Sequence, residues 1–504
     1  MKKALFTTPI FYVNAKPHIG HLHSIVLADT AARWSKFWGT PSAMVTGTDE
    51  HGTKVANAAA AANQQPKQFV DTLSKTFKDL SDKAKINYDR FIRTTDPDHE
   101  EQARQVWTTL QEKGLIYKGK HQGWYCISDE TFYSETELED RPEGKFSKES
   151  GNPVEWYEET NYFFALSKLQ PQLKELYESS PTFVLPSGRH QQLATELATQ
   201  PLTDLSISRP AARCPWGIKV PGDSSQTMYV WFEALINYLT AAKSLGIPWP
   251  AHTHVIGKDI MRFHGIYWPA FLLGAGLEVP KHVVIHPHWT IEGSKMSKSK
   301  NNVVDPMEAI DEFGNDTVRY FLLHDSSLDH DTPYSADRIV ERHNVNLVNK
   351  LSNLFARVCG PKFSISESKV QSIPNWSAQA KHNELIEQLR ELPEIVNGYV
   401  ENFEFSRALS KLNDAAMAVN VYFQDTEPWA AEDAVQQTVV ATTADSCRII
   451  AILLQPFCPD YSAKMLDRLA VHPEKRSVEY ARVGADSSFG ENANRKGDFV
   501  LQRL

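Results

Sequence analysis

The sequence predicts an α/β protein whose core is a doubly wound parallel sheet, divided by an inserted domain and followed by a bundle of helices. Three observations lead to this fold class. Strand-like and helix-like segments alternate at the start of the chain, the same alternation returns in its middle, and the last third shows only helical spacing of apolar residues. Such alternation is typical of a parallel sheet covered by helices.

The first predicted unit is a strand, a helix and a second strand. Residues 4–8 form a strand-like run, and after a loop the apolar positions recur at helical spacing until Gly39 and Pro41 end the helix. These helical positions are Leu22, Ile25, Ala28 and Ala32. A second strand over residues 43–46 runs into a polar turn at residues 47–52. Because ligands of such sheets bind at the carboxyl ends of strands, we expect the functional site there.

Changes in the pattern of apolar, aromatic and charged residues divide the rest of the chain into further parts. Short aromatic strands and charged loops indicate an insertion, and three later segments, residues 227–230, 254–256 and 283–285, are predicted as strands of the second half of the sheet. Helical spacing then dominates, as at Leu409, Leu412, Ala416, Val419 and Phe423. The predicted parts are the first half of the sheet (1–115), the insertion (116–225), the second half (226–290), a loop and connecting region (291–336) and the helical domain (337–504).

The composition excludes some classes of protein. No apolar run approaches the roughly 20 residues that span a bilayer, so we expect no membrane segment. The net charge of -9 argues against general binding to a polyanion but permits a local basic face. The five cysteines form no C-x-x-C pair, which indicates a reducing compartment. A strand-like segment directly after Met1 predicts that a targeting peptide is absent or already removed.

The sequence His18-Ile19-Gly20-His21 lies in the loop between the first strand and the first helix. Backbone amides and the dipole at a helix start favour an anion such as a triphosphate, and imidazoles add donors for phosphate oxygens. Gly20 would let a flat base approach the backbone. Taken alone, these histidines could also form a metal cluster with His23 or lie at the surface, so a second motif is needed.

The second motif is Lys295-Met296-Ser297-Lys298-Ser299, in a loop opened by Gly293 after the last predicted strand of the sheet. Its two lysines can neutralise charge as an α-phosphate is attacked and pyrophosphate leaves. By itself such a loop could be a solvated surface turn. The two motifs in this order and in these contexts indicate activation of a substrate by ATP.

With these motifs the chain resembles the class I aminoacyl-tRNA synthetases, whose HIGH and KMSKS sequences it matches without substitution. The resemblance implies a Rossmann-like catalytic domain with an inserted connective domain. It also implies attack of an amino-acid carboxylate on the α-phosphate of ATP, bound with Mg²⁺, and transfer to the 3′ end of tRNA. The expected catalytic residues are His18, His21, Lys295 and Lys298. The expected ATP contacts add Gly20, Gly257, Asp259, Met296, Ser297 and Ser299.

Four further segments narrow the resemblance to the methionyl-tRNA synthetases, namely residues 8–14, 46–52, 229–234 and 256–260. Position by position, the family's methionine pocket falls on Ile10, Tyr12, Trp231, Ala234, Leu235, Tyr238, Ile260 and His264. An apolar pocket rich in aromatic rings suits a flexible, polarizable thioether. Asp49 would hold the substrate ammonium, and Arg209 matches a family arginine near the substrate. Each residue alone would more often be a core residue or an ordinary ion pair, so the motif match carries the assignment.

The helical domain predicts a contact with RNA. Polar residues recur there every three or four positions and would form a stripe along one helix, namely Arg342, Asn346, Asn349, Asn353 and Arg357. Such a stripe is typical of a face that contacts solvent, but amides and guanidiniums are also suited to reading unstacked bases. By resemblance, the CAU anticodon of tRNA(Met) would be read by Asn353, Arg357, Pro428 and Trp429. Trp429 could equally be a buried anchor at a helix end.

We expect no zinc and no other metal site, because a zinc knuckle needs four ligands and the inserted domain offers Cys126 and the distant Cys214. Residues 123–133 and 150–156 resemble the mitochondrial branch, particularly its fungal forms, so the expected location is the mitochondrial matrix, with a bacterial cytoplasm as the alternative. The absence of an appended C-terminal domain suggests a monomer.

Two other functions stay open. One is a catalytically idle paralogue that only binds tRNA, which the intact HIGH and KMSKS sequences disfavour. The other is a different class I synthetase, such as the cysteine enzyme, which would hold zinc at its substrate pocket.

Overall fold

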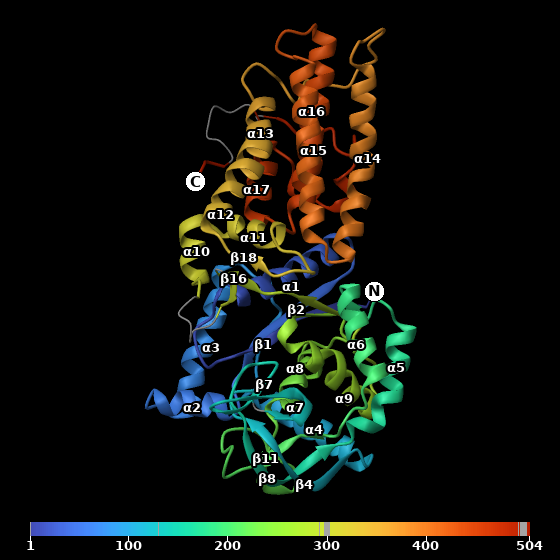
Figure 1. Cartoon of the computed structure of the whole chain (residues 1–504). Coiled ribbons are helices and arrows are strands. Elements are labelled where there is room, and N and C mark those ends of the chain that lie inside the picture. The colour runs from blue at the N-terminus through green and yellow to red at the C-terminus, as the bar shows by residue number, and fades with distance from the viewer. Residues whose placement is uncertain (1, 130, 292, 297–302, 492, 494–500) are drawn as a thin grey trace. The chain divides into compact units, whose positions relative to one another are not determined.

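The computed structural model describes residues 2–504 except 130, 292, 297–302, 492 and 494–500 (Figure 1). The chain forms two compact units. Unit 1 comprises residues 1–28 and 42–286, and unit 2 comprises residues 29–41 and 287–504. Helix α1 (Ile19–Phe37) belongs to both, because its first part lies in unit 1 and its last part in unit 2.

A six-stranded parallel sheet forms the centre of unit 1. Its strands are β1 (Ala4–Tyr12), β2 (Ser42–Asp49), β3 (Arg90–Arg93), β9 (Val184–Leu185), β14 (Thr253–Gly257) and β15 (His282–His286). They are ordered β3-β2-β1-β14-β15-β9, and each neighbouring pair is parallel. This confirms the predicted α/β class. The strand order reverses between β1 and β14, and ligands of such sheets bind at that point.

Strand β1 continues past the predicted end at residue 8 and reaches Tyr12. Pro9 has no N–H to give to a neighbouring strand, and the pairing with β2 shifts its register between Thr7 and Ile10. Pairing then resumes and includes Tyr12 opposite Asp49. The shift therefore carries Ile10 and Tyr12 to the carboxyl edge of the sheet.

The prediction that residues 227–230 form a strand of the parallel sheet is wrong. Strand β13 (Asp223–Met228) instead pairs with β11 (Ser208–Pro210) and β12 (Lys219–Val220) in a separate antiparallel sheet. Val230 already begins helix α7 (Val230–Leu235). Apolar alternation predicts extended backbone but does not specify the partner strand. The edge position is taken by β9, from within the predicted insertion, which pairs with β15.

The helices of unit 1 lie around this sheet (Figure 1). Besides α1 and α7 they are α2 (Thr53–Ala61), α3 (Pro66–Lys83), α4 (Pro97–Glu112), α5 (Gln170–Ser179), α6 (Ser187–Thr199), α8 (Asn237–Ser244) and α9 (Trp268–Ala275). A π-helical turn, Phe263–Tyr267, precedes α9. Apolar side chains of α4, α7, α8 and α9 share one buried core with β14 and β15. This core fixes the helices that carry the site described below.

The inserted residues form their own antiparallel sheet, with strands in the order β10 (Leu205–Ser206), β8 (Glu155–Phe164), β4 (Ile116–Cys126) and β5 (Thr131–Tyr133). Strands β6 (Leu138–Arg141) and β7 (Gly144–Ser147) form a hairpin. The aromatic segments expected to be strands, residues 123–125 and 161–164, lie in β4 and β8, which pair along most of their length.

Besides the last part of α1, unit 2 contains a small sheet in which β16 (Trp289–Ile291) pairs with β17 (Ser294–Lys295) and β18 (Thr332–Pro333). Its helices are α10 (Pro306–Phe313), α11 (Asn315–His324), α12 (Ala336–Arg342), α13 (Asn353–Val358), α14 (Gln379–Glu401), α15 (Phe405–Asp425), α16 (Asp433–Leu454) and α17 (Pro459–Arg468). Figure 1 shows α14, α15 and α16 side by side. The apolar positions predicted to face a core in α15 are buried, which confirms the helical bundle.

The polar stripe predicted on one long helix is divided, because His343–Ser352 between α12 and α13 is π-helical. A different number of residues per turn moves side chains off a common face. Asn346 is buried and donates to the Tyr320 hydroxyl at 3.0 Å. Arg342 donates to the Asp325 carboxylate at 2.7 Å. These two members of the stripe therefore take part in internal contacts.

Among the described residues, helix α16 is long and apolar enough to cross a membrane, but 83% of its apolar window is buried inside the protein. The core helix of a bundle meets the same criteria of length and composition, so α16 is weak evidence for a membrane segment.

Candidate active site

A pocket lies at the carboxyl ends of β1 and β2. It is lined by Pro9, Ile10, Tyr12, Asp49, Trp231, Ala234, Leu235, Asn237, Tyr238 and His264. The strands supply the first four residues, and α7, α8 and the π-helical turn supply the others. Most of the residues that the sequence assigned to one substrate pocket, all but Arg209 and Ile260, are thus brought together in unit 1.

Aromatic rings form one side of the pocket. The Trp231 indole stacks on Phe263 with ring centroids 3.8 Å apart and an interplanar angle of 13°. Tyr12 meets Trp231 edge to face at 6.1 Å. Such pairs stabilise each ring in its orientation. The result is a polarizable apolar surface that suits an aliphatic or thioether side chain.

His264 and Tyr238 form an uncharged polar part of the pocket. Nδ1 of His264 lies 3.0 Å from the Ile260 carbonyl oxygen, which only accepts, so Nδ1 carries the ring proton. Nε2 then accepts from the Tyr238 hydroxyl at 2.8 Å. Burial lowers the pKa of His264 to about 4 and raises the pKa of Tyr238 above its usual value. Both groups are therefore neutral near pH 7.

Asp49 is the acidic residue of the lining and is buried at the end of β2. Its position depends on Gly47, which pairs with Ile92 of β3. A Cβ atom at Gly47 would lie 1.9 Å from the Ile92 carbonyl oxygen, so only glycine allows the two strands to approach here. Gly47 thus sets the path of the end of β2, which carries Asp49.

His18 and His21 lie at the start of α1. The His18 amide donates to Nδ1 of His21 at 3.0 Å, and the Gly20 amide donates to Nδ1 of His18 at 3.1 Å. Because both Nδ1 atoms accept, each neutral imidazole carries its proton on Nε2. The two ring centroids are 3.9 Å apart. The helix start therefore holds two Nε2–H donors together, an arrangement suited to phosphate oxygens.

Gly257 and Asp259 follow β14, the strand beside β1. A Cβ atom at Gly257 would lie 2.7 Å from Oδ1 of Asp259, so glycine lets the carboxylate keep this orientation. At the end of β15, His286 Nε2 lies 2.7 Å from Ser24 Oγ of α1. The ATP residues predicted in unit 1 therefore share the edge where the strand order reverses.

The KMSKS sequence belongs to unit 2. Lys295 ends β17 and pairs with Thr290 of β16. Gly293, with a φ of 75°, makes the turn between these strands, and Met296 is buried. Ser297, Lys298 and Ser299 lie outside the described residues.

Arg209 and Ile260, which the sequence assigned to the pocket, do not line it. The Arg209 guanidinium lies 4.7 Å from the Tyr229 ring centroid and donates to the Ser206 carbonyl at 3.2 Å. The Ile260 side chain packs against the hydrophobic core, and its carbonyl accepts the His264 proton. Ile260 thus acts on the pocket through its backbone.

Pro9 and Asn237 line the pocket and were not predicted. Asn237 is 1% exposed and donates to the Ala234 carbonyl at 2.7 Å. Asn237 is a polar residue within the largely apolar run from Trp231 to Leu239, and a buried amide needs hydrogen-bond partners. Its position in this run could therefore have indicated a functional role. Pro9 gave no such signal.

Three of the predicted anticodon residues are connected in unit 2. The Arg357 guanidinium lies 4.8 Å from the Phe423 ring centroid and donates to Gln424 at 2.9 Å. The Phe423 ring centroid in turn lies 6.1 Å from that of Trp429, a residue that is 39% exposed. The carbonyl of the buried Pro428 accepts from Gln436 at 2.7 Å. Asn353 starts α13 one turn before Arg357.

Within the part of the chain that the structure describes, no group of three or more His, Cys, Asp or Glu residues is arranged to hold a metal ion. Burial raises the pKa of the Cys126 thiol to about 12, and Asp129 adds to the rise.

A doubly wound sheet with HIGH at the point of strand reversal, KMSKS after the last strand and a helical bundle beyond them define a class I aminoacyl-tRNA synthetase. Residues 4–359 match the family described as tRNA synthetases class I (M). Residues 373–486 match the anticodon binding domain of methionyl tRNA ligase. The chain belongs to the methionyl-tRNA synthetase family.

Curated relatives support this membership. The chain is 44% identical to the probable mitochondrial methionine–tRNA ligase of Neurospora crassa, over 96% of this chain and 82% of that protein. It is 42% identical to the mitochondrial methionine–tRNA ligase of Candida albicans, over 99% and 95%. A solved structure of Mycobacterium tuberculosis methionyl-tRNA synthetase in complex with methionyl-adenylate matches with a TM-score of 0.91 and 37% identity, over 97% of this chain and 98% of that chain.

Proposed function

We propose that the pocket of unit 1 binds L-methionine while the enzyme, a methionine–tRNA ligase, converts it with ATP to methionyl-adenylate and transfers the methionyl group to the 3′ end of tRNA(Met). The observation that supports this assignment is the lining itself, in which one carboxylate stands beside an otherwise apolar and uncharged surface. A free amino acid with a long apolar side chain has the complementary pattern.

Asp49 would accept hydrogen bonds from the methionine ammonium, a charge-assisted contact in a partly dry site. The side chain would extend toward Trp231, Ala234 and Tyr238, where sulfur near aromatic rings is favourable. A charged side chain would lose its hydration without gaining a partner, because His264 and Tyr238 are neutral. Ile260 and Arg209 belong to this proposal as neighbours of the pocket.

ATP, delivered with Mg²⁺, would lie along the edge formed by β1 and β14. The Nε2–H groups of His18 and His21 are suited to the charge that builds on phosphate oxygens, and Lys295 and Lys298 would add positive charge. Gly20, Gly257 and Asp259 would contact the nucleoside, and Met296, Ser297 and Ser299 complete the proposed ATP residues. Catalysis of this type depends on positioned charge more than on covalent participation.

The helical bundle would read the CAU anticodon through Asn353, Arg357, Pro428 and Trp429. Trp429 is 39% exposed, and its neighbour Phe423 holds the Arg357 guanidinium over its ring. An exposed aromatic ring suits stacking of an unpaired base. We further propose that the enzyme acts as a monomer in the mitochondrial matrix, the location in the names of its fungal relatives. The expectation that it needs no zinc remains a prediction.

Asp49→Asn tests the role of the pocket, because it removes the charge and keeps the size. Loss of a desolvated charge contact costs about 2–3 kcal/mol, which is a rise of about 30- to 150-fold in the KM for methionine. The KM for ATP should change little in methionine-dependent pyrophosphate exchange. Asp79→Asn, at an exposed ion pair of α3, is the control. An unchanged KM for methionine would exclude Asp49 from ammonium binding.

A further inference from the structure

Residues 47–52, the end of β2 and the turn that follows it, carry Asp49, and the other members of this segment fasten it to the surrounding protein. Thr48 shares a hydrogen bond with Ser74 of α3 at 2.9 Å. The Glu50 amide donates to the Thr94 hydroxyl at 2.9 Å, and the Gly52 amide donates to the Trp216 carbonyl at 3.1 Å. A turn with so many partners has one conformation, so the direction of its side chains is set in advance.

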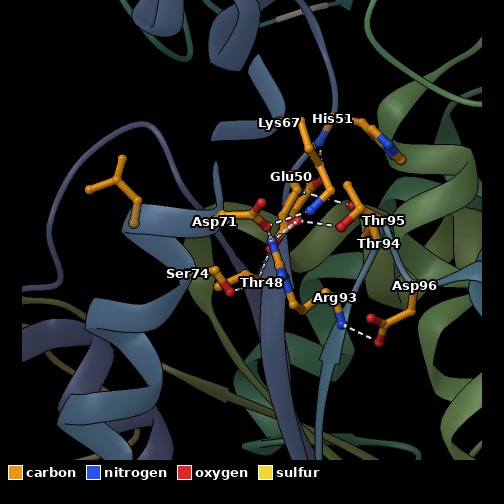
Figure 2. A network of polar contacts seen from close by, with 12 residues as sticks. Thr48, Glu50, His51, Lys67, Asp71, Ser74, Arg93, Thr94, Thr95 and Asp96 are labelled. Carbon is orange, nitrogen blue, oxygen red and sulfur yellow. Dashed lines mark hydrogen bonds and ion pairs between the residues drawn. The ribbon is translucent and has the colours of Figure 1, made fainter. Parts of the chain in front are cut away.

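Glu50 is the most strongly held residue of this turn, although its side chain is fully buried (Figure 2). The Arg93 guanidinium donates to both carboxylate oxygens, from Nε at 2.6 Å and from Nη2 at 2.9 Å. The hydroxyls of Thr95 and Thr48 donate at 2.6 and 2.9 Å. A buried carboxylate is stable only with such pairing, and a bidentate guanidinium also fixes its direction.

The negative charges of Glu50 and Asp71 are paired with the positive charges of Arg93 and Lys67. Arg93 also donates to Asp71 of α3 at 2.5 Å, and Lys67 donates to the same carboxylate oxygen. Figure 2 shows the four charged groups in one continuous network. Burial alone would lower the pKa of Arg93, but Glu50 and Asp71 raise it above its usual value, so the guanidinium stays charged. Glu50, Asp71, Arg93 and Lys67 together therefore carry no net charge.

His51, the residue after Glu50, connects this segment to helix α7, which also lines the pocket. Its Nδ1 lies 3.0 Å from Glu233 of α7, and the second oxygen of Glu233 lies 2.9 Å from Nε2 of His99. Glu233 is the residue directly before Ala234, which lines the pocket. The Trp216 indole N–H donates to the Glu50 carbonyl at 2.6 Å. Glu50 and His51 are thus both held by other elements, and the His51 amide also donates to Oδ1 of Asp49 at 3.5 Å.

We infer that Arg93 and Glu50 are positioning residues that hold the Asp49 carboxylate toward the pocket and so set the affinity for the ammonium group of the amino-acid substrate. Neither residue lines the pocket. The Thr48 hydroxyl donates to Glu50 at 2.9 Å, so the side chains of residues 48 and 50 lie on the same side of the backbone. Asp49, between them, lines the pocket. Anchoring Glu50 behind the turn therefore directs Asp49 to the front. This inference rests on the proposed role of Asp49 in binding methionine.

Arg93→Met tests the inference, because it keeps the length of the side chain and removes both hydrogen bonds to Glu50. A misplacement of about 1 Å at a substrate contact lowers the rate by as much as about 10²-fold, so we expect the KM for methionine to rise about tenfold or more. The KM for ATP should stay within about twofold. Arg93→Lys, which keeps the charge but not the bidentate geometry, should give an intermediate KM.

The decisive measurement is a cycle with Asp49→Asn in pyrophosphate exchange. If Arg93 acts through Asp49, the effect of Arg93→Met on the KM for methionine disappears in the Asp49→Asn background. Independent effects that multiply would overturn the inference, as would an equal rise in the KM values for methionine and ATP. If Asp49→Asn alone leaves the KM for methionine unchanged, the proposed role of Asp49 fails instead, so the two failures are distinguishable.

Two further variants keep the test valid. Removing one member of a buried ion pair leaves an unpaired charge and can unfold the protein. If Arg93→Met is not folded by circular dichroism, Thr95→Val replaces it, because this change removes one hydrogen bond to Glu50 at constant charge and similar volume. It should raise the KM for methionine alone, and no change would count against the inference. Lys75→Gln, at the exposed pair with Asp79 on α3, is the matched control and should behave as the unmodified enzyme.

Discussion

Replacing Gly20 by alanine should separate stability from catalysis. Gly20 is the second residue of α1, and alanine is favoured over glycine within a helix by about 1 kcal/mol. The new Cβ atom, however, would lie 2.9 Å from Cε1 and 3.0 Å from Nδ1 of the His18 ring. Carbon atoms prefer a separation of about 3.5–4.0 Å, so the ring must move by about 0.6–1.1 Å.

That movement also weakens the hydrogen bond from the Gly20 amide to Nδ1 of His18, which fixes the proton on Nε2. A shift of about 1 Å in a catalytic group costs up to about 10²-fold in rate, or about 2.7 kcal/mol of transition-state stabilisation. We therefore expect Gly20→Ala to lower kcat for adenylate formation by about ten- to a hundredfold while the melting temperature stays equal or rises.

The assays are single-turnover formation of methionyl-adenylate and thermal unfolding. Gly398→Ala is the matched control, because Gly398 lies inside helix α14 and a Cβ atom there would meet nothing within 4 Å. It should raise the melting temperature and leave the rate unchanged. A full rate for Gly20→Ala would refute the role of the His18 orientation, and parallel losses of rate and stability would show that Gly20 is needed for folding.

Three further predictions concern other parts of the chain. Trp429→Ala should cripple charging of tRNA and leave adenylate formation nearly intact, and equal loss of both steps in the two assays would show that Trp429 is structural. The pKa of His264, lowered by burial to about 4, lies below the ordinary value near 6.5, so its contribution to stability is present above pH 6.5 and is lost as the pH falls toward 4. Between pH 7.5 and 5 this loss is about 2 kcal/mol. The fall in the free energy of unfolding between these two pH values, measured by urea unfolding, should be smaller for His264→Gln than for the unmodified enzyme, and an equal fall would contradict the assigned protonation. Prolonged treatment with a zinc chelator should leave pyrophosphate exchange unchanged, and a loss restored by zinc would contradict the predicted absence of a zinc site.

Much of the fold followed from local pattern. The strands at residues 254–256 and 283–285 were placed correctly because they are short apolar runs between turns, which is typical of buried parallel strands. The prediction that residues 227–230 belong to the parallel sheet was wrong because the same alternation of apolar residues also fits an antiparallel strand. Strand β9 was not predicted because it is only two residues long and shows no recognisable pattern. Pairing between strands distant in sequence is decided by tertiary packing.

The helical domain shows a second limit. The apolar spacing of α15 follows an ordinary helix and was read correctly, whereas the polar spacing from Arg342 to Arg357 crosses a π-helical segment. Nothing in the spacing of residues reveals a local change in helical pitch. Asn346 therefore looked like a surface residue, although it is buried against Tyr320.

The candidate site was predicted by motifs rather than by physical pattern. Tyr238 and Trp231 are indistinguishable from core residues by spacing, and only the family resemblance assigned them to a pocket. The network of Glu50 and Arg93 was not predicted, because its members come from separate elements and each charge alone fits an exposed surface residue. The burial of Glu50 and its bidentate pairing with Arg93 became evident only in three dimensions.

The most direct test of the account is pyrophosphate exchange into ATP without tRNA, with the standard amino acids measured in parallel. The account predicts exchange with methionine alone, because the pocket joins one carboxylate to a neutral apolar surface. Exchange with another amino acid, such as cysteine, would contradict the assigned specificity. No exchange with any amino acid would contradict the assigned activity and favour a paralogue that only binds tRNA.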